Sequence, residues 1–71
     1  MRITYDKDAD ALYIALRDAT PVDSIDVQDG ITIDLDADGK VTGIEILDAH
    51  DVLGPDPLAS VAFERLPATA A

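Results

Sequence analysis

The chain has 71 residues, of which 48% are hydrophobic, and a formal net charge of -10 from 15 acidic and 5 basic side chains. This balance argues against direct nucleic-acid binding, which needs lysine and arginine to displace counterions from phosphate, and against anionic membrane surfaces. The hydrophobic content is too high for a disordered chain, and no apolar run approaches the ~20 residues of a membrane span. We therefore expect one folded domain that favours cations or basic partners.

A domain of this size buries a modest core, which rarely supplies more than roughly 3–5 kcal/mol. Small domains recover stability through disulfides, metals or self-association. The chain has no cysteine, so metal binding or oligomerisation remains. The lack of cysteine and of an apolar signal segment in MRITYDKD is compatible with a cytoplasmic location.

Two short apolar segments near the N-terminus alternate with period two. Residues 2–6 (RITYD) place Ile3 and Tyr5 on one side, which predicts a strand. Residues 11–17 (ALYIALR) also alternate, although alanine and leucine would permit a helix. The polar turn KDAD separates the two segments, and we interpret the pair as a β-hairpin.

A connection and a short strand follow. Residues 18–23 (DATPVD) contain a proline and predict a loop. Residues 24–28 carry Ile25 and Val27 in alternation, which is compatible with a short edge strand. Asp29-Gly30 then predicts a turn.

The clearest hairpin lies in the middle of the sequence. Residues 31–36 (ITIDLD) alternate apolar and polar side chains, Asp38-Gly39 is a hairpin-turn signal, and residues 40–47 (KVTGIEIL) return. The parity of the apolar positions changes across Thr42-Gly43. A glycine at such a change indicates a β-bulge.

The pattern of alternation ends after Asp48. Residues 49–57 (AHDVLGPDP) predict a connection with room for one helical turn. Asp56 suits a helix N-cap, and the apolar stripe that follows predicts a short helix over residues 57–66. Pro67 ends this helix, and residues 67–71 form a flexible tail.

These elements predict an α+β fold. We expect a small antiparallel β-meander of about four strands in two hairpins, with one short C-terminal helix, as a single domain over residues 1–66. A helix of about ten residues covers only part of the aliphatic sheet face, so the remainder predicts a homodimer. Tyr13 and Phe63 are the candidate interface residues, since large aromatic side chains anchor interfaces.

Two segments carry a family resemblance: ITYDKDADALYIAL near the N-terminus and DGITIDLDADGKVTGIEILDA in the middle. Over residues 1–50 the chain resembles the small bacterial and archaeal domain of unknown function 2283 family (DUF2283). The resemblance implies a β-rich domain and defines no functional residue. Some members of that family lie beside genes for small toxin-like ribonucleases, so the resemblance implies an antitoxin-like partner of a basic protein.

The stretch DLDADGKVTGIE matches the spacing of an EF-hand calcium loop through Asp34, Asp36, Asp38 and Glu45. EF-hand loops join two helices, whereas both flanks here alternate with period two. Asp38-Gly39 is also the expected pair for a tight turn. A strand hairpin without metal is therefore the favoured interpretation, and a calcium-binding domain is the alternative.

Features of a catalytic site are weak. His50, flanked by Asp48 and Asp51, is the sole histidine, and no serine or cysteine nucleophile motif accompanies it. Aspartates in solvated turns lack the apolar pocket that an acid/base pair requires. We predict no catalytic residue and no cofactor, with a non-enzymatic protein-interaction module as the favoured function and an uncharacterised hydrolase as a further alternative.

Overall fold

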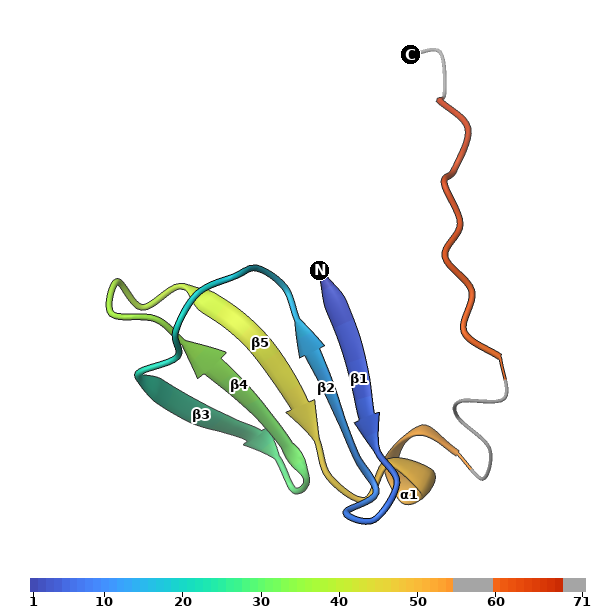
Figure 1. The fold of residues 1–71 in the computed structure, drawn as a ribbon, viewed down its shortest axis with the longest axis horizontal. Helices are drawn as coiled ribbons and strands as arrows, with labels where there is room; N and C mark the ends of the chain where they lie inside the picture. The colour runs from blue at the N-terminus through green and yellow to red at the C-terminus, as the bar shows by residue number, and fades with distance from the viewer. Residues whose placement is uncertain (55–59, 69–71) are drawn as a thin grey trace.

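The computed structural model describes residues 1–54 and 60–68. Five strands, β1 (Arg2–Asp6), β2 (Ala11–Ala15), β3 (Asp23–Gln28), β4 (Ile31–Leu35) and β5 (Val41–Ile46), precede helix α1 (Ala49–Leu53). They form one antiparallel sheet (Figure 1). The α+β class is confirmed, and the sheet has one strand more than the four expected, because the segment around Ile25 does pair as an edge strand.

The strand order is β1-β2-β5-β4-β3, which corrects the expected meander. Consecutive strands β2 and β3 are not neighbours, because β5 and β4 lie between them, and strands β2 to β5 form a Greek key. The connection from β2 to β3 crosses the end of the sheet, where the Leu16 N–H donates to Thr42 (2.9 Å) and the Val22 N–H donates to Leu35 (2.8 Å). This order places β5, with its apolar Ile44 and Ile46, between two other apolar strands.

The hairpin turn between β4 and β5 has the predicted glycine conformation. Gly39 lies in the left-handed region at φ 78°, which glycine adopts without steric cost. The Asp36 carboxylate accepts the backbone N–H groups of Asp38 and Lys40, each at 2.9 Å. These bonds fix the turn, so the aspartate and the glycine of this sequence both have a structural role.

The predicted β-bulge is present in β5. Asp34 on β4 pairs with Gly43 and the next residue, Leu35, pairs with Val41, so Thr42 is the extra residue. A second irregularity in β3, between Asp26 and Gln28, was not expected from the sequence.

The strand register divides the side chains between two faces of the sheet. We call one of them the aliphatic face. Its aliphatic members are Ile3, Leu12, Ile14, Ile25, Ile31, Ile33, Leu35, Val41, Ile44 and Ile46, and the register also places Tyr5, Asp23 and Gln28 on this face. The other, which we call the polar face, carries Thr4, Tyr13, Ala15, Thr32, Asp34, Gly43 and Glu45. As expected, Tyr5 and Tyr13 fall on opposite faces.

The buried core is small and lies at one end of the aliphatic face. Among the described residues, the buried hydrophobic side chains are Leu12, Ile46 and Ala49. Ala49 belongs to α1, and Val52 of the same helix packs against this cluster. Helix α1 therefore covers one end of the sheet (Figure 1). No helix among the described residues is long and apolar enough to span a membrane.

The expected helix over residues 57–66 is absent from its described part, since residues 60–66 form no helix. Residues 57–59 and 69–71 of the expected helix and tail lie outside the described residues. Residues 60–68 instead run away from the sheet (Figure 1), with Phe63 83% exposed. A helix this short is marginal in water without a surface to pack on, and the chain instead forms its helical turn earlier, at α1.

Candidate functional site

The aliphatic face is largely without a covering layer. Ile3 on β1 is 48% exposed and Ile25 on β3 is 52% exposed, at opposite edges of the sheet. The inner strands keep Ile14, Ile33 and Ile44 only partly buried. A row of aliphatic side chains that crosses the whole sheet is the kind of apolar patch that marks an interaction surface.

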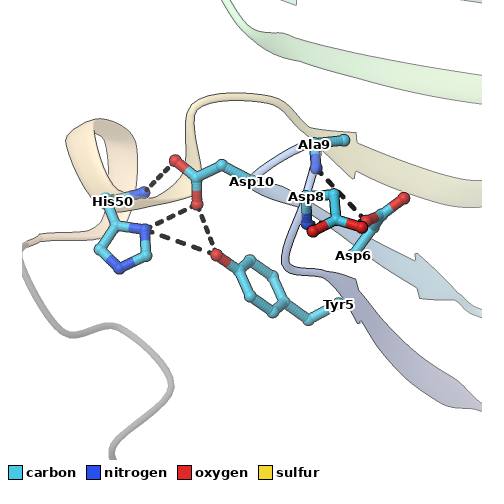
Figure 2. A network of polar contacts seen from close by, with 6 residues as sticks. All are labelled: Tyr5, Asp6, Asp8, Ala9, Asp10 and His50. Carbon is cyan, nitrogen blue, oxygen red and sulfur yellow. Dashed lines mark hydrogen bonds and ion pairs between the residues drawn. The ribbon is translucent and has the colours of Figure 1, made fainter.

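Three polar side chains, from β1, the β1–β2 turn and α1, form a cluster that joins the start of the sheet to the helix. The Tyr5 hydroxyl donates to Asp10 Oδ1 at 2.7 Å, and His50 Nδ1 lies 2.7 Å from the same oxygen (Figure 2). Tyr5 is on β1, Asp10 is in the β1–β2 turn and His50 is on α1. Asp48 and Asp51 flank His50 in the sequence, but the structure pairs it with Asp10, forty positions away.

Asp10 also caps α1. Its carbonyl accepts the Ala49 N–H at 2.9 Å, and its Oδ2 accepts the His50 N–H at 3.2 Å. The first amides of a helix have no partner within the helix, and the residue before α1, Asp48, provides no side-chain cap. Asp10 adopts φ 51°, a left-handed conformation that aspartate tolerates better than most residues. The turn thus holds the helix against the sheet.

The charge of Asp10 follows from these contacts. The Tyr5 hydrogen bond, and then that of His50, lower the pKa of the Asp10 carboxyl below its ordinary value. The same hydrogen bond to Asp10 raises the pKa of the Tyr5 hydroxyl. An aspartate–histidine pair can orient a general base. Here the contacts of Asp10 with the Ala49 and His50 amides fasten α1 to the β1–β2 turn.

On the polar face, Tyr13 lies across the bulge. Its hydroxyl donates to Asp34 Oδ2 at 2.8 Å, spanning from β2 to β4 over β5. A Cβ atom at Gly43 would lie 2.2 Å from the Tyr13 hydroxyl and 2.5 Å from its Cζ, so only glycine leaves room for the ring. The hydrogen bond to Asp34 raises the pKa of Tyr13, and the nearby Thr42 hydroxyl acts in the opposite direction.

The carboxylates of the calcium-like stretch have other partners. Asp34 accepts from Tyr13, and Asp36 forms an ion pair with Arg17, which lowers the pKa of the Asp36 carboxyl. Glu45 lies on β5 opposite Thr32, and the flanks of the turn are strands, as expected. In the part of the chain that the structure describes, no three acidic or histidine side chains converge to hold a metal ion.

The two predicted interface residues lie in different parts of the molecule. Tyr13 is half-buried on the polar face and bound to Asp34, whereas Phe63 is exposed in the C-terminal segment.

The role of Asp10 was not found from the sequence, because nothing local indicates an aspartate that caps a helix forty positions later. A glycine at a parity change was the available signal for the close approach of Tyr13 to Gly43.

The fold and these clusters define a single-layer antiparallel sheet with one aliphatic face, one polar face and a short helix fastened at one end. A family model described as "Protein of unknown function (DUF2283)" matches residues 2–50. The chain belongs to this family, as the resemblance indicated. No curated protein and no solved structure matches the chain. The matched segment contains Tyr5, Asp10 and His50 and leaves Phe63 outside.

Proposed function

We propose that this protein is a non-enzymatic interaction module that self-associates through its aliphatic face. The observation that carries the proposal is the exposure of aliphatic side chains on both edge strands of a largely aliphatic face, represented by Ile3 and Ile25. A sheet with one apolar face is stable when a second layer covers that face. Helix α1 covers one end, and a second copy of the chain would cover the rest.

The small size of the buried core favours a partner that is bound whenever the protein is folded. Among the described residues, Leu12, Ile46 and Ala49 are the buried hydrophobic side chains, and such a core supplies little of the free energy of folding. Covering half of an aliphatic side chain contributes roughly 1 kcal/mol. If covering these side chains supplies a large part of the stability, the partner must be present wherever the protein folds. A second copy of the same chain is always present.

The distribution of charge also permits two copies to stack. Asp34 and Glu45 of the inner strands lie on the polar face. The Asp26 carboxylate accepts the Thr32 hydroxyl on that same face, at 3.1 Å. Two aliphatic faces can therefore meet with these carboxylates on the outer surfaces, where water screens their repulsion, while the exposed Asp23 on the aliphatic face lies at the start of the edge strand β3.

Paired variants on the edge strands test the proposal. Ile3→Lys/Ile25→Lys places two charges on the aliphatic face, and Thr4→Lys/Ser24→Lys places the same two charges on neighbouring exposed positions of the polar face. By sedimentation velocity at micromolar concentration, we expect a dimer for the wild type and the control, and a monomer or unfolded chain for the first variant. A monomeric wild type would contradict the proposal.

A second measurement covers the case in which the first variant does not fold. If folding is coupled to self-association, the melting temperature of the wild type must rise with protein concentration. A monomer whose melting temperature is independent of concentration would show that the aliphatic face does not bind a second copy, and a different protein would then be its partner. Given the net charge of -10, that protein would be a basic one.

A further inference from the structure

The polar face contains a hollow of about 440 Å³, within the range of small-molecule sites. The side chains of Arg2, Tyr13, Ala15, Arg17, Pro21 and Thr42 contribute to its walls. Ala15, a small residue on β2, is among the residues that line it. The connection from β2 to β3 forms one side of the hollow.

Basic side chains gather at this hollow of an acidic molecule. The chain has five basic residues and a net charge of -10, and two arginines, Arg2 and Arg17, line the hollow together with Asp18. Arg17 donates from Nε to Val41 and from Nη2 to Asp36, which leaves further guanidinium N–H groups free. Within residues 1–54 and 60–68, Arg2 has no ion-pair partner.

Thr42 supplies an independent observation at the same place. It is the extra residue of the bulge, is 2% exposed, and lines the hollow. Its hydroxyl oxygen is shielded from solvent and makes no ordinary hydrogen bond among the described residues, although it lies close enough to the Tyr13 hydroxyl to lower the pKa of Tyr13. Buried polar groups are nearly always hydrogen-bonded, so this hydroxyl would gain a partner if the wall of the hollow moved to expose it.

We propose that this hollow binds a small molecule that carries an oxyanion group, a carboxylate or a phosphate, on an apolar body. Arg2 and the free N–H groups of Arg17 contact the oxyanion group, and guanidinium groups suit both kinds. A movement of the wall that exposes the Thr42 hydroxyl lets it donate a hydrogen bond to the ligand. Ala15 and Pro21 contact the apolar part. The hollow lies on the face opposite to the proposed interface, so the two proposals can be tested separately.

The test is an NMR titration of the ¹⁵N-labelled full chain with three six-carbon probes: hexanoate, hexyl phosphate and the neutral hexanol. We expect saturable shifts of amide resonances around the hollow with at least one of the two anions, and none with hexanol. The anion that saturates identifies the source of the oxyanion group. An absence of saturable shifts with both anions, or equal shifts with hexanol, would overturn the proposal.

Three variants locate the binding. Arg2→Gln should weaken the anion about tenfold or more, as expected for one charge-assisted hydrogen bond. Lys40→Gln removes the same charge in the β4–β5 turn, outside the hollow, and should change affinity less than about twofold. Thr42→Val keeps the shape of the side chain, and should weaken binding without lowering the melting temperature. Equal losses from Arg2→Gln and Lys40→Gln would show general charge attraction and overturn the site.

Discussion

Replacing Gly43 by alanine should destabilise the protein through Tyr13. The new Cβ would lie 2.2 Å from the Tyr13 hydroxyl and 2.5 Å from its Cζ, so the ring must leave its place over β5. Overpacking of this kind costs about 1–3 kcal/mol, and the lost hydrogen bond to Asp34 adds about 1 kcal/mol. Reduced freedom of the unfolded chain returns about 0.4–1 kcal/mol. We expect a net loss of about 2 kcal/mol.

The same substitution in a Tyr13→Ala background isolates the cause. Without the ring, the closest remaining atom to the new Cβ is the Ile14 carbonyl oxygen at 3.0 Å, which requires a small adjustment. Gly43→Ala should then change the free energy of unfolding by less than about 0.5 kcal/mol, so the coupling in the double-mutant cycle is about 2 kcal/mol. Tyr13→Phe keeps the ring and its Cζ, and should not relieve the effect.

Urea unfolding followed by far-ultraviolet circular dichroism measures all six chains, namely the wild type, the two Tyr13 variants and Gly43→Ala in the wild-type, Tyr13→Ala and Tyr13→Phe backgrounds. Each must be measured at the same protein concentration, because self-association changes apparent stability. If Gly43→Ala destabilises the Tyr13→Ala background as strongly as the wild type, the ring does not lie over Gly43 and the description of the polar face is wrong.

Three further predictions concern the turns and the carboxylates. The pKa values of Asp10 and Asp36 are lowered from 3.8 in the folded protein, so their contribution to stability is present above about pH 4 and is lost as pH falls through the lowered values; urea midpoints measured between pH 7 and pH 2 should fall, and less steeply for Asp10→Asn. Gly39→Ala should cost about 1–2 kcal/mol through its left-handed φ alone, since no other atom lies within 4 Å of the new Cβ, and Gly39→Asn should cost less in the same urea assay. Millimolar calcium should leave the melting temperature unchanged relative to chelator, because Asp34 and Asp36 already have partners; a calcium-dependent increase would restore the EF-hand-like alternative.

The local features of the sheet could be predicted from the sequence. Alternation indicated β1, β2, β4 and β5 and was compatible with β3, the Asp-Gly pair indicated the turn at Gly39, and the parity change indicated the bulge at Thr42. Each of these depends on residues within a few positions of one another. The period-two pattern states which side chains share a face, and the register bears out that division for Tyr5 and Tyr13.

Non-local features could not be predicted in this way. The pairing of β5 with β2 depends on how well the side chains of distant strands pack together. Nothing in the sequence around Ile14 or Ile44 distinguishes this pairing from that of a meander. The contact between Asp10 and His50 joins positions forty residues apart. The apolar stripe over residues 57–66 suggested a helix, but amphipathic spacing produces a helix only where a surface receives its apolar side.

The position of β5 has a consequence for synthesis of the protein. β5 is the last strand among the described residues, yet it lies between β2 and β4 and joins the β1–β2 hairpin to the β3–β4 hairpin within the sheet. Isolated two-stranded hairpins are marginally stable in water. A nascent chain that ends before residue 41 therefore holds two unstable halves with their isoleucines exposed, and folding as one unit must wait until β5 has left the ribosome. This late step is the interval in which the growing chain is most open to aggregation.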